Sequence, residues 1–555
     1  MRGAAVRAFL AAAIFAAGVV VASAAGPATA SPPSPSPPPS AAATPAGSPP
    51  PTTSPSPSPS SSPSPAATAT QPPIVVNPAA AEVPVGSERV VQAGSVLGTI
   101  TAAAADPTLV GVRVDQVALT VTLTGKAPGT TVVTVTDQRG MTANVPVRVA
   151  YKAGSVAATA SIRITGDPAS SLFVKRQAVA AATALARLRP GAQVVTGVDD
   201  VSFDTPLAQD DVATLNVPIL IQGKGYFGVR ATTAVRVTNM AAPKIRPRSL
   251  MVSDYPEKLE ADGVLFTADL KREQPSRFLY FHYNPPGEPD RRIVLQAVNR
   301  SPEPAIVQFI SGAGGPGKNE MEVGHDSTRR FLVRLVQNEG RIIEIPGYGT
   351  MNLSEQELPA KNVVCNLLQL RVLNGSVVRL TLFAENASAS HVVPAAGGEL
   401  LHGTQRHARG IYAIPEFHYS ALWSVTDPYL ELPIGQIPLP NLMRGEALSG
   451  DYGVLQSFVV MVENPTAVPQ PIAIYENPRG GYATGTYLID GVLVQSHQVP
   501  PFSRYKIRQY VVPAKGFVRV TIETIPEGGS SYPLRLILAP DDGSVPPGAP
   551  GSPVY

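Results

Sequence analysis

Apolar and polar side chains alternate along many short stretches of this chain, and this alternation constrains its fold more than any other feature. Between residues 117 and 123, Val and Leu take every second position, with Ala and Thr between them. Residues 133–135 and 145–149 repeat the pattern. A period of two places alternate side chains on opposite faces, which is typical of a half-buried β-strand. Because turn residues separate these stretches, the sequence predicts a small β-sandwich.

The same segment resembles a known module. Residues 106–107 (D-P), 125–131 (G-K-A-P-G-T-T) and Asp137 are similar to the bacterial Ig-like repeat, and equally to the related N-terminal domain of pilus-assembly secretins. The resemblance covers residues 74–150. It implies a spacer or protein-contact module without catalytic residues, and the membrane-barrel part of a secretin has no counterpart later in the sequence.

The N-terminal sequence predicts export. Arg2 and Arg7 precede a charge-free apolar run that ends in small-residue triplets, as in a secretory signal peptide. An uncleaved membrane anchor is the alternative. Residues 31–73 are rich in Pro and Ser and carry no charge, so they are expected to be a disordered, extended linker. This linker is either a spacer or a merely tolerated connection, and the expected location is the periplasm, the cell surface or the medium.

The cysteine count excludes a disulfide-stabilised fold, and the charge distribution argues against a nucleic-acid-binding protein. Cys365 is the single cysteine among 555 residues, so no intrachain disulfide forms, and its apolar surroundings (NVVCNLLQL) predict a buried hydrophobe. The formal net charge is +3 and the basic residues are scattered. This pattern argues against a nucleic-acid partner.

A helical stretch interrupts the β-pattern between residues 153 and 242. Ser170 or Ser171 is expected to cap a helix that continues to the Pro-Gly pair at 190–191. Strand patterns follow it. The segment is therefore predicted to be a small α+β domain with one helix on an antiparallel sheet.

The C-terminal half of the sequence contains an internal duplication. Residues 292–310 parallel 457–475, and 374–383 parallel 515–524, which predicts two related β-sandwiches in tandem. The fold class is thus mainly β, with tandem Ig-like sandwiches and one small α+β domain. In chain order the predicted parts are a signal peptide (1–30), a linker (31–73), an Ig-like sandwich (74–152), an α+β domain (153–242), a first sandwich (250–395), a second sandwich (396–545) and a disordered tail (546–555).

This half also resembles an uncharacterised family of exported bacterial proteins over residues 250–540. The resemblance rests on SDYPEKLEADGVLF (253–266), VNRSPEP, GSVVRLTLFAEN, HARGIY (407–412) and GDYGV (450–454) followed by VENPT. The family has no established activity, so the resemblance implies export and fold only.

The sequence contains no complete catalytic motif. In SGAGGPGKN, residues 311–319, the spacing of Gly312, Gly317 and Lys318 is that of a phosphate-binding loop, but Asn319 replaces the Ser or Thr that would hold Mg²⁺. Gly324 is expected to prevent the helix that should follow, so the run is interpreted as a turn. Ser327 is expected to cap a short helix instead.

The histidine-rich stretch 402–419 is the candidate metal site. His402, His407, Glu416 and His418 offer imidazole and carboxylate ligands that suit Zn²⁺. Arg406 and Arg409 would repel a cation, so a polar loop between the sandwiches is the favoured interpretation, with no metal and no cofactor. Tyr419, Trp423 and Tyr429 are a possible ligand contact, with core packing as the alternative for Trp423.

These observations predict an exported envelope or secreted protein that binds a protein or glycan partner, or that has a structural role, and that is not an enzyme. Two alternatives stay open. One is a secreted hydrolase or metal-dependent enzyme that uses the 402–418 region. The other is an accessory protein of pilus or secretion-system assembly.

Overall fold

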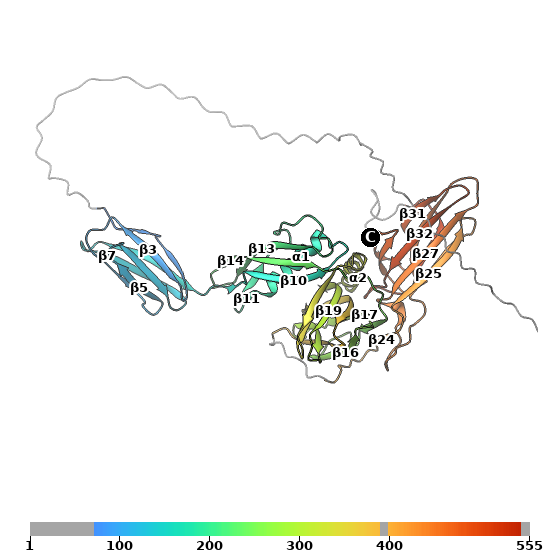
Figure 1. Ribbon diagram of the computed structural model, residues 1–555, viewed down its shortest axis with the longest axis horizontal. Helices are drawn as coiled ribbons and strands as arrows, with labels where there is room; N and C mark the ends of the chain where they lie inside the picture. Colours follow the sequence, from blue (N-terminus) through green and yellow to red (C-terminus); the bar gives the residue numbers. More distant parts are fainter. Residues whose placement is uncertain (1–71, 389–397, 545–555) are drawn as a thin grey trace, which may run out of the picture. The chain divides into compact units, whose positions relative to one another are not determined.

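The computed structural model describes residues 72–388 and 398–544 (Figure 1). The predicted signal peptide, the linker up to residue 71 and the predicted tail lie outside the described residues. The described part holds 33 β-strands and two α-helices. The prediction of a mainly β chain with tandem β-sandwiches is confirmed. Neither helix is long and apolar enough to cross a membrane.

The N-terminal module is a sandwich of two four-stranded sheets. Its core is formed by alternate side chains such as Val121, Leu123, Val133 and Val135, as the period of two predicts. The predicted strand at 117–123 begins later, because the Asp115 carboxylate accepts the N–H groups of the next turn and leaves Val117 97% exposed. One sheet has the order β1 (Val75–Asn77), β3 (Glu88–Gly94), β6 (Thr120–Gly125), β5 (Val110–Asp115), and the other has the order β2 (Ala81–Pro84), β8 (Thr142–Ala150), β7 (Gly129–Asp137), β4 (Ile100–Ala104).

A ten-stranded sheet runs through both the predicted α+β domain and the first sandwich. The two parts join where β10 pairs with β20, with Arg163 opposite Ile342. At the far edge, β24 pairs with β15 although it falls within the predicted second sandwich. The strand order is β12 (Gln193–Val195), β13 (Val212–Gln222), β14 (Val229–Asn239), β10 (Thr159–Thr165), β20 (Gly340–Ile345), β19 (Ala305–Gly317), β22 (Asn362–Asn374), β17 (Ser276–Asn284), β15 (Ser249–Ser253), β24 (Arg409–Tyr412).

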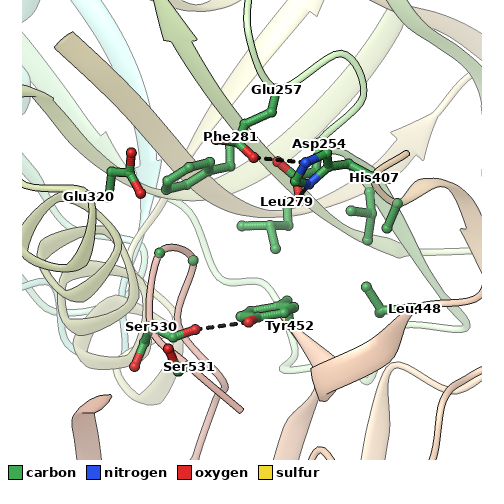
Figure 2. Close-up of a pocket in the computed structure, with 14 residues that line it drawn as sticks. Asp254, Glu257, Leu279, Phe281, Glu320, His407, Leu448, Tyr452, Ser530 and Ser531 are labelled. Carbon is green, nitrogen blue, oxygen red and sulfur yellow. Dashed lines mark hydrogen bonds and ion pairs between the residues drawn. The ribbon is translucent and has the colours of Figure 1, made fainter. Parts of the chain in front are cut away.

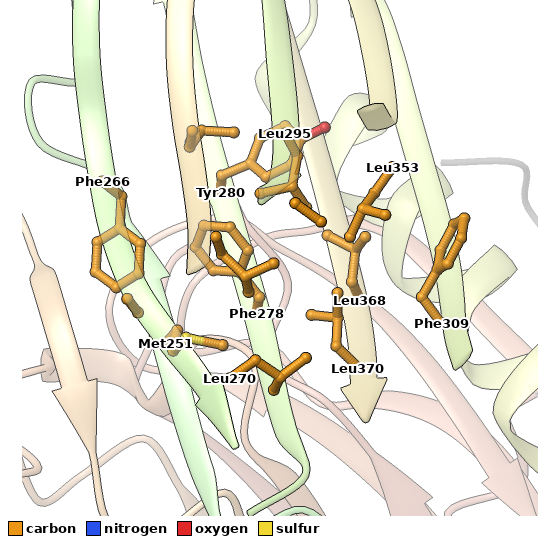
Figure 3. Close-up of a cluster of buried hydrophobic side chains, with 14 of the residues drawn as sticks. Met251, Phe266, Leu270, Phe278, Tyr280, Leu295, Phe309, Leu353, Leu368 and Leu370 are labelled. Atoms are coloured by element: carbon orange, nitrogen blue, oxygen red, sulfur yellow. The ribbon is translucent and has the colours of Figure 1, made fainter. Parts of the chain in front are cut away.

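A second sheet closes the first sandwich. Its apolar face packs on the ten-stranded sheet through buried side chains that include Phe266, Phe278, Leu295 and Leu368 (Figure 3). Burial of these large apolar side chains is the main stabilising contribution here. The strand order of this sheet is β16 (Gly263–Lys271), β23 (Val377–Asn386), β18 (Arg291–Asn299), β21 (Thr350–Leu358).

Helix α1 (Ser171–Ala184) begins where the sequence predicts and ends earlier. Ser170 is the N-cap, and its hydroxyl oxygen accepts the N–H of Phe173. The predicted continuation to residue 190 is wrong, because Arg187–Leu188 forms β11 and pairs with β9 (Gly154–Ser155). Backbone pairing therefore replaces the last predicted turn.

Helix α2 (Glu320–Val336) corrects two expectations. It starts directly after the Gly-rich run, which belongs to β19, and the Asn319 side chain caps it. Ser327 lies buried in the middle of the helix rather than at its start. A Cβ on Gly312 or Gly314 would lie within 2.3 Å or 2.1 Å of a carbonyl oxygen of α2. The glycines thus let helix and strand approach closely.

The second sandwich contains Trp423 in its core, 3% exposed. Its sheets face each other as in the first sandwich, and β25 runs parallel to β27 at one edge. The first sheet has the order β25 (Glu416–Ser424), β27 (Leu455–Asn464), β32 (Gly516–Thr524), β29 (Ala483–Ile489), β30 (Val492–Val499). The second has the order β26 (Leu430–Ile434), β33 (Leu534–Pro540), β28 (Gln470–Pro478), β31 (Tyr505–Val512).

The turns at Asn299 and Asn464 use the same hydrogen bonds. In each, the amide oxygen accepts the N–H and the hydroxyl of the residue two positions on. Each side-chain NH₂ donates to three carbonyls, one of them four residues on. The acceptors are Glu303, Ile345 and Pro346 in the first turn, and Val468, Val512 and Pro513 in the second.

The predicted correspondence of residues 374–383 with residues 515–524 is wrong, because the two segments do not take equivalent positions in the two sandwiches. Lys515 has a φ of 54° and donates its N–H to the carbonyl of Thr466. The residue that repeats this geometry in the first sandwich is Tyr348, with a φ of 55° and a bond to Ser301. The counterpart of β32 is therefore β21. The sequence of β23 resembles that of β32 only because both strands alternate apolar and polar residues.

Candidate binding cavity between the C-terminal sandwiches

Helix α2 lies at the joint between the two C-terminal sandwiches. Val323, Phe331 and Leu332 of this helix share one buried apolar cluster with Leu488 and Ile525 of the second sandwich. The loop after β32 closes against the helix so tightly that a Cβ on Gly324 would lie 1.7 Å from the Gly528 oxygen. The joint therefore has the close packing of a protein core.

A cavity of about 300 Å³ opens beside this joint (Figure 2). Asp254, Glu257 and His407 lie on one side of it, and Tyr452 and the loop residues of the second sandwich lie on the other. Apolar side chains complete the wall. The cavity thus mixes acidic and other polar groups with apolar side chains, and polar atoms form the larger part of its surface.

Strand pairing brings the polar groups together from distant parts of the sequence. Asp254 follows β15 and His407 precedes β24, and Ser253 lies opposite Arg409 in that pair. The backbone N–H of Asp254 donates to Ala408 O at 2.9 Å, and the N–H of Tyr283 donates to Glu257 O at 2.8 Å. The backbone on both sides of the cluster is therefore fixed.

His407 lies between two carboxylates. Its Nδ1 is 3.4 Å from Asp254 Oδ2 and its Nε2 is 3.1 Å from Glu257 Oε2. Asp254, Glu257 and His407 each offer one ligand atom, and the three atoms lie within 4.8 Å of one another. In the described part of the chain, Asp254 Oδ1 is buried without a hydrogen-bond partner.

The electrostatics of the cluster favour protonation. Burial raises the pKa of Asp254 to about 6, against the opposing effect of His407. The hydrogen bond with Asp254 raises the pKa of His407. Burial, helped by the charge of Glu257, raises the pKa of Glu320 on the cavity wall. These three groups therefore keep their protons to a higher pH than they would in water.

The four residues of the predicted metal site do not meet. His407 lines the cavity, whereas His402 packs against the ring of Tyr255, with centroids 6.0 Å apart. His418 Nε2 lies 3.4 Å from Glu416 Oε2. Glu416 is itself bound to another partner. The structure therefore separates Glu416 and His418 from His402 and His407, which both line a smaller neighbouring cavity.

That partner is Arg277, which is completely buried in β17. Its guanidinium donates to Glu416 Oε1 at 3.0 Å and to the backbone carbonyls of Pro415 and Gly453. Because these acceptors belong to the second sandwich or its entry, the ion pair is a polar link across the joint.

The three aromatic candidates lie away from the cavity lining. Trp423 is a core residue, and its burial fits the packing alternative. Tyr419 is exposed and stacks on Phe458 with centroids 5.1 Å apart, and Tyr429 is exposed. Of the three side chains, Tyr419 and Tyr429 are the two that offer exposed surface to a ligand.

Ser327 and Cys365 carry nucleophilic atoms, and the fold buries both side chains. His325 faces Glu527 rather than its neighbour Ser327, whose Oγ accepts the N–H of Leu367. Burial raises the pKa of the Cys365 thiol to about 12, as expected for an unreactive core cysteine.

Sequence reasoning missed Asp254, Glu257 and Glu320. A usable signal was present in LMVSDYPE, where two carboxylates directly follow an apolar strand. Glu320 gave no such signal, because its helix was not expected to begin there.

Comparison with protein-family models and with curated proteins finds no match. Solved structures give only remote similarities. A tri-modular GH5 endo-β-1,4-glucanase from Bacillus licheniformis is 12% identical over 30% of this chain and 39% of its own length, with a TM-score of 0.12. The Bacteroides ovatus mixed-linkage glucan utilization protein SGBP-B is 10% identical over 55% and 73%, with a TM-score of 0.14. Mouse cadherin-23 is 11% identical over 31% and 65%, with a TM-score of 0.13. At these TM-scores the similarities carry no argument about function.

Proposed function

We propose that this protein is an exported envelope or secreted binding protein whose C-terminal sandwiches together hold a protein or glycan partner. The observation that carries the proposal is the cavity whose walls come from both sandwiches. A buried joint fixes those walls in relation to each other, so the site is formed before a ligand arrives. Preformed sites bind with a smaller loss of conformational entropy.

The lining suits a small polar group. Asp254 and Glu257 accept hydrogen bonds from hydroxyl or amine donors, and Phe281 and Leu448 offer apolar contact. A volume of about 300 Å³ lies at the lower end of ligand pockets. The expected occupant is therefore one sugar ring or one side chain of a larger partner.

The N-terminal parts complete the proposal. A signal peptide at 1–30 and a Pro-rich linker at 31–73 would export the chain and hold its folded part away from a surface. The Ig-like module would act as a spacer or as a protein contact. A role as an accessory protein of pilus or secretion-system assembly is the alternative that the Ig-like module suggests.

The test compares the wild type with two variants that add the same bulk at different places. Ser531→Phe fills the cavity, and Ser420→Phe places a ring on the exposed face of β25. Binding is measured on glycan arrays and by cross-linking in envelope fractions, followed by titration of each ligand found.

The expected result is a ligand that the wild type and Ser420→Phe retain equally and that Ser531→Phe binds at least about tenfold more weakly. Equal binding by both variants would place the partner elsewhere and contradict the proposal. Hydrolytic turnover of a bound glycan would favour the enzyme alternative instead.

A further inference from the structure

We propose that Asp254, Glu257 and His407 form a binding site for a divalent transition-metal ion, with Zn²⁺ as the first candidate. The site lies in the cavity wall, so a position on the ion remains open toward the cavity. This inference concerns the protein alone and does not depend on the partner proposed above.

The donor set selects the class of ion. One imidazole and two carboxylates suit Zn²⁺ and its neighbours, whereas Mg²⁺ and Ca²⁺ prefer oxygen donors alone. Three protein ligands and an open fourth position are the usual arrangement of a reactive zinc ion. No other group of at least three Asp, Glu, His or Cys side chains within reach of one ion occurs among the described residues.

The distances are close to those of a coordination shell. Tetrahedral bonds of 2.0–2.1 Å place ligand atoms about 3.3 Å apart. His407 already lies 3.4 Å from Asp254 and 3.1 Å from Glu257. Because each carboxylate faces a different ring nitrogen, one side chain must turn for all three to bind. These side chains are partly exposed, so the required movement of about 1–2 Å is open to them.

Asp254 supplies independent support. Its Oδ1 is buried and has no hydrogen-bond partner among the described residues. A buried carboxylate oxygen without a partner loses the hydration free energy of that atom, and a cation would restore it. Glu320 adds a further negative charge at the same wall, opposed by Lys258 beside Glu257.

The surroundings hold the ligands in place. The imidazole of His282 is buried beneath the 253–257 loop, with Nδ1 2.9 Å from Pro256 O and Nε2 3.3 Å from Ser253 Oγ. Burial lowers the pKa of His282 to about 4, so this ring stays neutral and adds no charge that would repel the ion. Arg409 lines a neighbouring cavity together with His407, and its guanidinium donates to three backbone carbonyls, one of them that of Tyr255 in the ligand loop. The ligand loop thus has the supporting contacts that metal sites require.

The competing explanation is a plain ion pair in which a protonated His407 bridges the two carboxylates without any metal. The two explanations differ in proton release. A metal must displace the proton of His407, whereas the ion pair retains it.

The test titrates the metal-stripped full chain with ZnCl₂ at pH 7.5 by calorimetry, and repeats the titration with CaCl₂ and MgCl₂. The variants are His407→Gln and the matched control His402→Gln, which removes a histidine outside the cluster. Circular dichroism of each stripped variant verifies that it is folded.

The expected result is one Zn²⁺ per chain with proton release, binding weakened at least about 100-fold by His407→Gln, and no change with His402→Gln. Binding is also expected to weaken as the pH falls from 7.5 to 5.5. If His407→Gln does not fold, Co²⁺ absorption and X-ray absorption of the wild type decide, with one imidazole and oxygen donors expected. Absence of Zn²⁺ binding, tighter binding of Ca²⁺, or equal losses in both histidine variants would overturn the proposal.

Discussion

Glu527 of the second sandwich lies 3.0 Å from His325 of helix α2, Oε2 to Nδ1, and both side chains are buried. The carboxylate also accepts the hydroxyls of Thr484 and Thr486 at 2.6 Å. On the other side of the ring, His325 Nε2 lies 3.1 Å from Gln495 Oε1. One charged group thus satisfies donors from two domains, which ties α2 to the sandwich that closes the cavity.

Removal of this carboxylate is expected to destabilise the joint. Glu527→Ala leaves Nδ1 of His325 and the hydroxyls of Thr484 and Thr486 without their carboxylate acceptor, and breaking such a buried pair costs about 3–5 kcal/mol. Chemical denaturation followed by the fluorescence of Trp423, the one tryptophan of the chain, measures this loss. Glu303→Ala, at an exposed turn, is expected to change the unfolding free energy by less than about 0.5 kcal/mol. Similar values for both variants would show that the buried pair contributes nothing.

Gly324→Ala is expected to weaken the joint although alanine favours helices. The gain in helix propensity is about 1 kcal/mol. The new Cβ would lie 1.7 Å from the Gly528 oxygen, and this backbone clash outweighs the gain because neither segment can move freely. Gly228→Ala is the control, since its Cβ would meet nothing closer than 3.6 Å. A stabilised Gly324→Ala protein would contradict the observed contact.

The two asparagine turns are expected to contribute equally to stability. Asn299→Ala and Asn464→Ala each remove five hydrogen bonds of the same geometry, and leave backbone carbonyls unpaired, at a cost of about 2–3 kcal/mol each. Asn374→Ala, at an exposed position, serves as the control. Unfolding free energies of the three variants test this. A large loss in one turn and none in the other would show that the two are not equivalent.

The second sandwich is expected to be more stable at pH 5 than at pH 8. Burial raises the pKa of Glu476 to about 7 and that of Asp451 to about 6, so the folded state binds protons that the unfolded state releases. The partner Glu527 raises the pKa of His325, against its burial, so its contribution is also present below pH 6.5 and is lost as the pH rises. All three groups therefore give the same sign.

Across this range the unfolding free energy is expected to fall by on the order of 2 kcal/mol, measured by denaturation with Trp423 as the probe. Glu476→Gln should flatten the dependence. A stability that rises from pH 5 to pH 8 would contradict these shifts.

The sequence predicted elements whose signals are local. The β-pattern, the cap at Ser170 and the turns at Asn299 and Asn464 depend on residues a few positions apart, and all are present. The end of α1 and the course of α2 could not be predicted from local sequence signals. The end of α1 is decided by the pairing of β11 with β9, and Gly324 is tolerated in α2 because the Gly528 loop must approach it.

The cavity depended on contacts that no local pattern carries. Asp254 and His407 are about 150 residues apart, and only the pairing of β15 with β24 brings them together. The sequence analysis grouped His407 with residues close to it in the chain. Its partners in the structure, Asp254 and Glu257, instead follow the end of β15. Glu416 was also predicted as a metal ligand, but its carboxylate forms an ion pair with the buried Arg277.

The central claim is that the two C-terminal sandwiches form a single unit around the cavity, and spin-label distances test it most directly. Labels at Glu303→Cys and Val468→Cys place one probe on an exposed turn of each sandwich, while the buried Cys365 stays unlabelled. One narrow distance distribution is expected for the labelled protein, and a broader one after Gly324→Ala is added. A broad distribution without that substitution would show that the sandwiches move independently, and the cavity would then not be preformed.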